Sequence, residues 1–251
     1  MAYSYLLALC FIQGVAEFLP ISSSAHLVLL PALSGMADQG DFIDVAAHFG
    51  SLLAVLVFYR RRVAEVLRLR DMELGYKIGL SFLPILLVGI FVMISGARPP
   101  RAVSIVAWNS VIFGILLWLA DRRAGVDGKV SYLNSLLAGI GQALAVIPGV
   151  SRSGIILTSL RAQGISRAAA VEFAFLMSIP AIAAATGEAM LSAHKSGLVV
   201  NWAETGFVVA TSFLFSLVAI KFMTAWVARR SMAVFAGYRV ALGVALLVWF
   251  V

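Results

Sequence analysis

Cysteine and charge are both scarce in this chain of 251 residues. The single cysteine, Cys10, excludes an intrachain disulfide and lies in an apolar run, where a small core residue is expected. Charged residues make up only 12% of the chain, whereas hydrophobic residues make up 62%. Several apolar runs approach the roughly 20 residues that a helix needs to cross a bilayer. The composition therefore indicates an all-α integral membrane protein without a separate soluble domain.

The chain also lacks the features of a nucleic-acid-binding protein or of a secreted precursor. Lys and Arg gather in the cytoplasmic loops of membrane proteins, which explains the net charge of +7, so we expect no nucleic acid among its partners. The first residues, MAYSYLLALCFIQG, carry no basic segment of a cleavable signal peptide and are expected in the mature protein. A single membrane domain over 1–251 is the simplest organisation.

Apolar runs bounded by charged clusters have the length and composition of transmembrane helices. Two further apolar regions, 1–31 and 131–160, are interrupted near their middle by Pro, Gly and Ser and do not fit this description. We therefore predict six transmembrane helices and two elements of another kind. The six predicted helices cover about 42–59, 76–97, 102–120, 169–187, 204–222 and 232–251.

The lysines and arginines assign the loops to the two sides of the membrane. Most of them lie on one side, whereas Arg98, Arg101 and Lys195 fall on the other. The heavier side is expected to be cytoplasmic. With this assignment the two halves run in opposite senses, and each interrupted region must enter and leave on the same side. We predict two re-entrant helical hairpins in two inverted-topology repeats, at about 1–120 and 131–251.

The two interrupted regions also align with each other in sequence. The stretch QGVAEFLPISSSA, at 13–25, can be laid over QALAVIPGVSRSG, at 142–154, without a gap. Inverted repeats with broken helices typically place a polar site where the two broken elements meet. The alignment pairs Gln13 with Gln142, Ser22 with Ser151, and Ser24 with Ser153.

A helix N-terminus inside the membrane is predicted in each hairpin. Pro20 should end the first incoming helix, and a serine among 22–24 is a good N-cap for the outgoing one. The segment PGVSRSG, at 148–154, repeats this pattern and adds Arg152, whose guanidinium matches phosphate oxygens. Because a helix N-terminus offers unpaired N–H groups and partial positive charge, we expect the two helix ends and Arg152 to clamp a phosphate.

Polar side chains near the breaks are candidates for chemistry. Gln13 and Glu17 lie one helical turn apart, as do Ser22 and His26. Ser23 or a neighbouring serine is a candidate nucleophile, His26 a proton-transfer partner, and Glu17 a base or a ligand of a divalent cation. Serines in membrane helices often only bond to their own backbone, whereas an ionisable group at membrane depth usually has a function.

Three further ionisable residues lie inside or near the predicted helices. His48 is expected either to serve the site or to pair with a neighbour, and the sequence does not decide between these roles. Glu172 and Arg239 are interpreted as members of a structural ion pair rather than as catalytic groups.

Long stretches of the chain resemble the undecaprenyl-pyrophosphate phosphatase family, also called the bacitracin-resistance protein family. The resemblance implies a bacterial inner-membrane enzyme that hydrolyses undecaprenyl pyrophosphate to undecaprenyl phosphate and inorganic phosphate. Such an enzyme recycles the lipid carrier for peptidoglycan synthesis and gives bacitracin resistance. The resemblance is carried by QGVAEFLPISSSAHL, FIDVAAHFGSLLAVLVFYRRR, PGVSRSGIILTSLRAQGISRAAAVEFAFLMSIPA and FAGYRVALG.

The same resemblance implies an architecture and a set of partners. It agrees with inverted repeats and two re-entrant hairpins, and it implies an active site facing the periplasm or the cell exterior. The lipid substrate and the membrane are the expected partners, with a homodimer as one expected assembly.

The resemblance also implies a role for individual residues. The acidic motif falls on Glu17, the serine nucleophile on Ser23 and the histidine on His26, while the phosphate-binding serine and arginine fall on Ser151 and Arg152. The predicted catalytic residues are Glu17, Ser23, His26 and Arg152, and the predicted substrate-binding residues are Gln13, Ser22, Ser24, Ser151 and Ser153.

The acidic motif departs from the pattern of some family members at one position. Those members have two glutamates four residues apart, whereas the first position here is Gln13. The resemblance implies a divalent cation, Mg²⁺ or Ca²⁺. Glu17 would then be its only carboxylate ligand from this motif, together with lipid phosphate oxygens and water.

Two mechanisms and a second function remain open at this point. Either Ser23 attacks the phosphorus, or a water molecule activated by Glu17 or His26 does so. A transporter or flippase of an anionic polyprenyl phosphate lipid would use the same broken helices, but it has less need of Ser23 and His26 together. Membrane lipid phosphatases that use two histidines and a separate basic motif match poorly, because no such pattern surrounds the other histidines.

Overall fold

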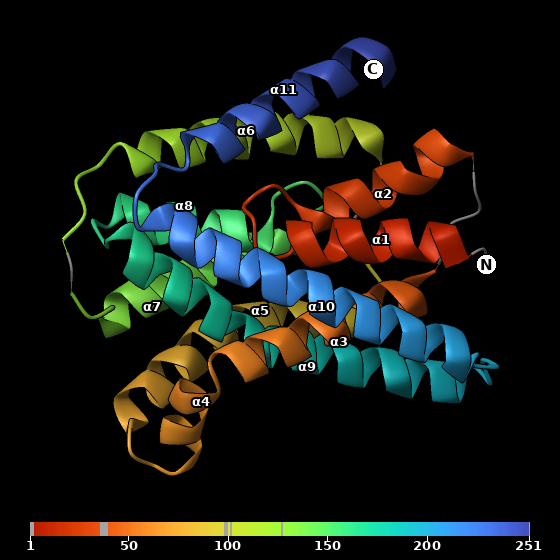
Figure 1. Ribbon diagram of the computed structural model, residues 1–251, viewed down its shortest axis with the longest axis horizontal. Helices are drawn as coiled ribbons and strands as arrows, with labels where there is room; N and C mark the ends of the chain where they lie inside the picture. The colour runs from red at the N-terminus through yellow and green to blue at the C-terminus, as the bar shows by residue number, and fades with distance from the viewer. Residues whose placement is uncertain (1–2, 36–39, 98–99, 101, 127, 251) are drawn as a thin grey trace.

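The computed structural model describes residues 3–35, 40–97, 100, 102–126 and 128–250, and its regular structure is helical (Figure 1). Arg98 and Arg101, two of the residues used to assign the membrane sides, lie outside this part of the chain. The helices are α1 (Tyr3–Ala16), α2 (Ser23–Ser34), α3 (Asp41–Phe58), α4 (Arg60–Leu67), α5 (Met72–Ser95), α6 (Val103–Asp121), α7 (Tyr132–Ala143), the 3₁₀ helix η1 (Leu144–Val146), α8 (Arg152–Ala162), α9 (Arg167–Lys195), α10 (Trp202–Val227) and α11 (Ala233–Phe250).

Helices long and apolar enough to cross a membrane are α3, α5, α6, α9, α10 and α11, with mean hydropathies of 1.7 to 2.5. They confirm the six predicted transmembrane helices. Helix α5 shows why the fold needs lipid: Leu87, Phe91 and Ile94 on its outer surface are 66%, 64% and 78% exposed. Exposed apolar surface of this extent is unfavourable in water and favourable in a bilayer. The protein is therefore a multi-pass membrane protein.

The two interrupted regions each form a pair of short helices joined by an irregular turn. Helix α1 is followed by residues 17–22 and then by α2, while α7 and η1 are followed by residues 147–151 and then by α8 (Figure 1). The arms have 11 to 14 residues, which corresponds to about 17–21 Å. A bilayer core is about 30 Å thick, so neither arm spans it alone. The pairs α1/α2 and α7/α8 are called the first and second hairpin below.

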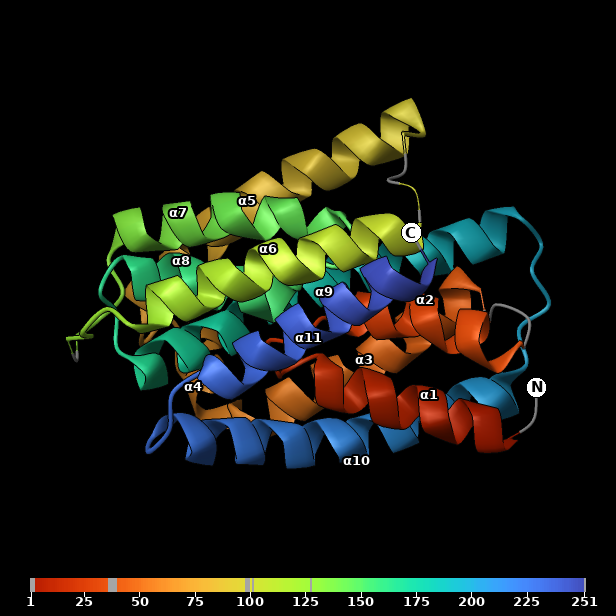
Figure 2. The same cartoon turned by 90° about the horizontal axis from the view of Figure 1, so that it is seen from above.

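Packing between the halves follows the pattern of the predicted repeat. If the first hairpin corresponds to the second, then α3, α5 and α6 correspond to α9, α10 and α11. Helix α1 packs on α10 and α7 packs on α5, while α3 packs on α10 and α9 packs on α5 (Figure 2). When each helix is replaced by its counterpart, the contact of α1 with α10 becomes that of α7 with α5, and the contact of α3 with α10 becomes that of α9 with α5. A twofold relation between the halves requires this. The inverted topology, the membrane entry sides and the repeat limits stay predictions.

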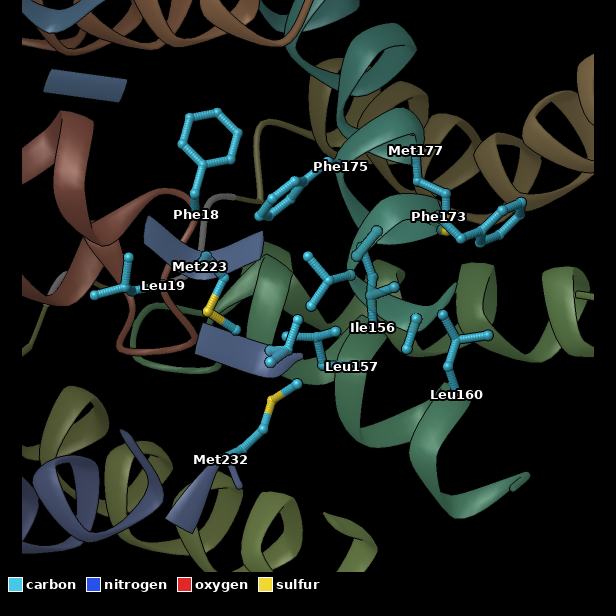
Figure 3. Close-up of a cluster of buried hydrophobic side chains, with 14 of the residues drawn as sticks. Phe18, Leu19, Ile156, Leu157, Leu160, Phe173, Phe175, Met177, Met223 and Met232 are labelled. Carbon is cyan, nitrogen blue, oxygen red and sulfur yellow. The ribbon is translucent and has the colours of Figure 1, made fainter. Parts of the chain in front are cut away.

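The largest hydrophobic cluster holds the turn of the first hairpin against the second half of the chain. Figure 3 shows Phe18, in that turn, beside Phe175 of α9, and their rings meet edge to face with centroids 5.1 Å apart. The same cluster buries Ile156, Leu157 and Leu160 of α8 completely. Because Phe18 follows Glu17 directly, this packing fixes the position of the predicted acidic residue.

An ion-pair cluster ties the ends of four elements together at the end of the molecule that carries α4. Asp121, at the end of α6, accepts hydrogen bonds from Arg161 Nε at 3.1 Å and from Arg167 Nε at 2.7 Å. Its Oδ2 also accepts the backbone N–H of Met232, just before α11, at 2.8 Å. Asp121 and Arg161 are both buried. One carboxylate thus links α6, α8, α9 and the start of α11.

The expected ion pair of Glu172 exists on the same side of the molecule. Arg62 Nε donates to Glu172 Oε1 at 3.0 Å, and its guanidinium also contacts Glu65. The carboxylate of Glu172 raises the pKa of Arg62. The partner of Glu172 is thus a residue of α4, which the sequence did not indicate.

We expect Asp121→Ala to lower the free energy of unfolding by about 3–5 kcal/mol, because it leaves the guanidinium of Arg161 buried without its counter-ion. The midpoint of thermal unfolding of the purified protein in detergent measures this. Glu65→Ala is the matched control, since it removes an exposed carboxylate whose ion pair contributes about 0–1 kcal/mol. Equal midpoints for the two variants would contradict the assignment.

Candidate active site

Glu17 is the centre of the polar residues at the turn of the first hairpin. It follows the last residue of α1, and its N–H still donates to the carbonyl of Gln13 at 3.0 Å, so the helical spacing continues through it. The side chain is buried. Its Oε2 accepts hydrogen bonds from Gln13 Nε2 at 2.9 Å and from Ser23 Oγ at 2.8 Å. The predicted nucleophile therefore donates its hydroxyl hydrogen to the predicted base.

Arg152, the first residue of α8, compensates the negative charge of Glu17. Its Nη2 forms an ion pair with Glu17 Oε1. The two charges come from different hairpins, and the carboxylate is more deeply buried than the guanidinium. A buried carboxylate is costly unless a positive charge compensates it. The ion pair therefore explains how Glu17 stays buried next to an apolar cluster.

A second contact joins the turns of the two hairpins. Ser153 Oγ, in the first turn of α8, donates to the carbonyl of Leu19 at 3.1 Å. This carbonyl lies in the irregular backbone before α2 and also accepts the N–H of Ile21 at 2.8 Å. Together with the ion pair of Glu17 and Arg152, the contact brings the two broken elements together, as the sequence predicted.

The two N-cap serines share an unusual backbone conformation. Ser22 has φ 73° and Ser151 has φ 69°. Residues other than glycine rarely adopt this region of backbone conformation. Ser22 Oγ accepts the N–H of Ala25 at 3.4 Å, and Ser151 Oγ accepts the N–H of Gly154 at 3.1 Å. Strained residues at equivalent positions of two turns indicate a functional constraint.

These caps leave backbone donors at the start of both helices. The N–H groups of residues 23 and 24 in α2, and of residues 152 and 153 in α8, make no hydrogen bond with another described group. Unpaired N–H groups at a helix start bind anions. The side chains of Ser24 and Ser153 lie against the capping hydroxyls, at 3.3 and 3.4 Å. The predicted substrate-binding serines therefore surround the two helix ends.

His26 lies apart from the carboxylate of Glu17. Its Nδ1 donates to the carbonyl of Ser22 at 2.7 Å, and its Nε2 is 2.6 Å from the hydroxyl of Tyr238 in α11. The two rings stack, with centroids 5.8 Å apart and an interplanar angle of 8°. Since both ring nitrogens have partners, neither contacts Ser23 or Glu17 in this structure. The role of His26 in proton transfer stays a prediction.

His48, whose role the sequence left open, is the imidazole that contacts Glu17. Its Nε2 lies 3.3 Å from Glu17 Oε2, while its Nδ1 donates to the carbonyl of Asp44 at 2.7 Å. The feature of the sequence that pointed to His48 was an ionisable side chain within a predicted transmembrane helix. Tyr238 was missed, although it lies in the quoted stretch FAGYRVALG, because nothing in that stretch indicates a contact with His26.

A divalent cation would find few protein ligands here. Among the described residues, no three His, Cys, Asp or Glu side chains converge on one point. Gln13 Oε1, however, is buried beside Glu17 and has no hydrogen-bond partner. Mg²⁺ commonly binds one or two protein oxygens and takes the others from substrate phosphates and water. Glu17 and Gln13 fit such a cation when the substrate supplies the remaining oxygens.

Among the described residues, six membrane-length helices and two broken hairpins that meet at a buried polar cluster define the class: a multi-pass membrane protein. The chain belongs to the family described as Bacitracin resistance protein BacA, whose model matches residues 6–245.

Relatives cover nearly the whole chain. It is 39% identical to an undecaprenyl-diphosphatase of Chromohalobacter salexigens over 263 aligned positions, with 99% of each chain covered. It is also 39% identical to one of Maricaulis maris, with 100% of both covered, and 38% identical to one of Nitrosococcus oceani, with 97% of both covered.

We expect Arg152→Gln to lower the stability of the protein by about 3 kcal/mol, because it leaves the carboxylate of Glu17 buried without its compensating charge. Adding Glu17→Gln should restore most of that loss, because the remaining amides carry no charge. Thermal unfolding of the wild type, both single variants and the double variant forms the cycle that measures the coupling. Additive losses in the double variant would show that the two side chains do not interact.

Proposed function

We propose that this protein hydrolyses undecaprenyl pyrophosphate to undecaprenyl phosphate and inorganic phosphate. Membership of the BacA family and the undecaprenyl-diphosphatase names of full-length relatives support this substrate and this reaction. The product would return as lipid carrier to peptidoglycan synthesis. Removing the pyrophosphate lipid from the membrane surface would give resistance to bacitracin.

One observation carries the proposal: Glu17 contacts a hydroxyl of one hairpin and a guanidinium of the other. Ser23 Oγ is 2.8 Å from Oε2, and Arg152 pairs with Oε1. A nucleophile held on a base is the arrangement that nucleophilic catalysis requires. An arginine beside unpaired helix N–H groups is the arrangement that binds phosphate.

The first step transfers the terminal phosphoryl group to Ser23. The hydroxyl oxygen forms a bond to the terminal phosphorus while its proton passes to Glu17, and the bridging P–O bond breaks to release undecaprenyl phosphate. Arg152 exchanges its contact with Glu17 for phosphate oxygens and stabilises the transferred charge. Water then hydrolyses the phosphoserine and releases inorganic phosphate. Direct attack by a water molecule on Glu17 is the alternative mechanism, and trapping of a phosphoserine distinguishes the two.

His26 and His48 have different surroundings in this scheme. His26 would take part in proton movement only if its ring leaves Tyr238 or Ser22, because those groups hold both of its nitrogens. His48 Nε2 already lies 3.3 Å from the carboxylate of Glu17. When a divalent cation is bound, it would be held by Glu17 and Gln13 and would neutralise phosphate charge.

The basic residues support an orientation in the bacterial inner membrane. The arginines of α4 and those that follow α6 and α10 lie at one end of the helices, and both chain termini lie toward the other end (Figure 1). By the preference of basic residues for the cytoplasm, the first hairpin enters from the periplasm or cell exterior and the second from the cytoplasm, with the site between them facing the periplasm or cell exterior. The homodimer stays a prediction.

A transporter or flippase of an anionic polyprenyl phosphate lipid is the second candidate, because broken helices also build transporter sites. A carrier would explain Arg152 and the helix ends. It would not need the hydroxyl of Ser23 to be held on a carboxylate. Release of inorganic phosphate in detergent, where no second compartment exists, would decide for hydrolysis.

We expect Ser23→Ala to reduce phosphate release from undecaprenyl pyrophosphate by at least 1,000-fold (about 4 kcal/mol), because it removes the attacking oxygen. The matched control is Ser178→Ala, since Ser178 is a buried serine whose hydroxyl only donates to the carbonyl of Phe175 in its own helix. The two variants should have similar thermal midpoints. Undiminished activity of Ser23→Ala would exclude Ser23 as the nucleophile.

We expect activity to be lost in a chelator and restored by Mg²⁺ or Ca²⁺, because Glu17 and the substrate together supply oxygen ligands. In Gln13→Glu a second carboxylate should lower the metal concentration for half-maximal activity by about tenfold, because cation affinity rises with the charge of the ligands. A titration of activity against free metal ion measures both effects. Full activity in excess chelator would refute the cation requirement.

A further inference from the structure

Arg239 of α11 is a buried arginine for which the scheme above has no use. The sequence interpretation placed it in a structural ion pair, and this is wrong for the described part of the chain, where its contacts are with carbonyl oxygens. Its Nη2 donates to the carbonyls of Gly149 at 2.8 Å, Val150 at 2.9 Å and Asn109 at 3.4 Å. The side chain is 0% exposed.

Two of its donor atoms have no hydrogen-bond partner. Nε and Nη1 are buried and unpaired in the described structure. Nη1 faces the first turn of α8: a methyl group added to Gly154 would lie 2.6 Å from Nη1 and 3.0 Å from Ser151 Oγ. The guanidinium therefore lies directly behind the helix end that carries Arg152.

Arg161 provides a comparison within the same helix. It is also a buried arginine in contact with backbone carbonyls, but it lies near the C-terminal end of α8 and pairs with Asp121. Its charge is therefore compensated. Burying a guanidinium without such a partner costs several kcal/mol. A neutral side chain with N–H donors could make the same hydrogen bonds to carbonyls at a lower free-energy cost of burial. The carbonyl contacts therefore do not explain why residue 239 is an arginine.

We propose that Arg239 is a positioning residue of the pyrophosphate site. It fixes the 149–150 turn, so that Ser151 and Arg152 face the first hairpin, and its uncompensated charge adds to the positive N-terminal end of α8. The charge acts across a few ångströms of low-dielectric protein, where electrostatic interactions are strong. The bound pyrophosphate supplies the missing counter-charge. This inference rests on the proposed function for the identity of the anion.

Binding of inorganic pyrophosphate to the purified protein in detergent tests the inference without requiring turnover. We expect Arg239→Gln to raise the dissociation constant at least tenfold. Arg239→Lys, which keeps the charge, should stay within threefold of the wild type although it loses hydrogen bonds and unfolds at a lower temperature. Arg161→Gln is the matched control and should lower the thermal midpoint while leaving the dissociation constant within twofold.

Three results would overturn the inference. They are unchanged pyrophosphate binding by Arg239→Gln, equal weakening in Arg239→Lys and Arg239→Gln, and equal weakening in Arg161→Gln. If the glutamine variant does not fold, Arg239→Met replaces it, because methionine removes the charge while keeping an unbranched apolar side chain in the buried space. Tenfold weaker binding then supports the inference, and binding within twofold of the wild type contradicts it.

Phosphate release from undecaprenyl pyrophosphate, measured on the same preparations, separates this inference from the proposed function. A wild type that binds pyrophosphate but releases no phosphate would refute the function alone. An active wild type with unaltered binding in Arg239→Gln would refute the positioning role alone. With both correct, Arg239→Gln raises KM at least tenfold and Arg239→Lys restores it.

Discussion

The buried ion pair between Glu17 and Arg152 is the interaction on which the site depends. A buried carboxylate is costly without compensation, and here the compensating charge comes from the other hairpin. The two hairpins must therefore meet before either charge can be buried. Under the proposed function, the arriving pyrophosphate competes with Glu17 for Arg152. Substrate binding then releases the carboxylate at the moment when Ser23 must lose its proton.

Broken helices leave backbone groups without partners inside the helix. Carbonyls at the two turns accept hydrogen bonds from side chains of other elements: Ser153 donates to Leu19, Asn109 to Pro148, and Arg239 to Gly149 and Val150. The N–H groups at the starts of α2 and α8 are not satisfied in this way. The packing thus compensates the acceptors and leaves the donors, which are the groups that a phosphate requires.

The sequence predicted the parts of this structure that depend on local pattern. The six membrane helices follow from hydropathy, and the two hairpins follow from Pro20, Pro148 and the serines behind them. Ser23 and Arg152 could be placed near Glu17 because the two hairpins align and ionisable groups at this depth are rare. The contacts of His26, His48 and Arg239 could not be predicted, because they depend on how α3 and α11 pack against the hairpins. When lipid covers the outer face of a helix, both its outer and its inner faces are apolar. The sequence then has no strong periodicity that identifies the inner face.

Tyr238 and Arg239 are consecutive in α11, yet one contacts the first hairpin and the other contacts the second. Successive residues of a helix project about 100° apart, so this division of contacts is possible only at one rotation of α11 about its axis. An insertion or deletion of a single residue within α11 before Tyr238 would turn both side chains away from their hairpins, although the helix would remain equally apolar. Natural length variation in this family should therefore fall in the loop before α11 or after Arg239, and not within its first turns.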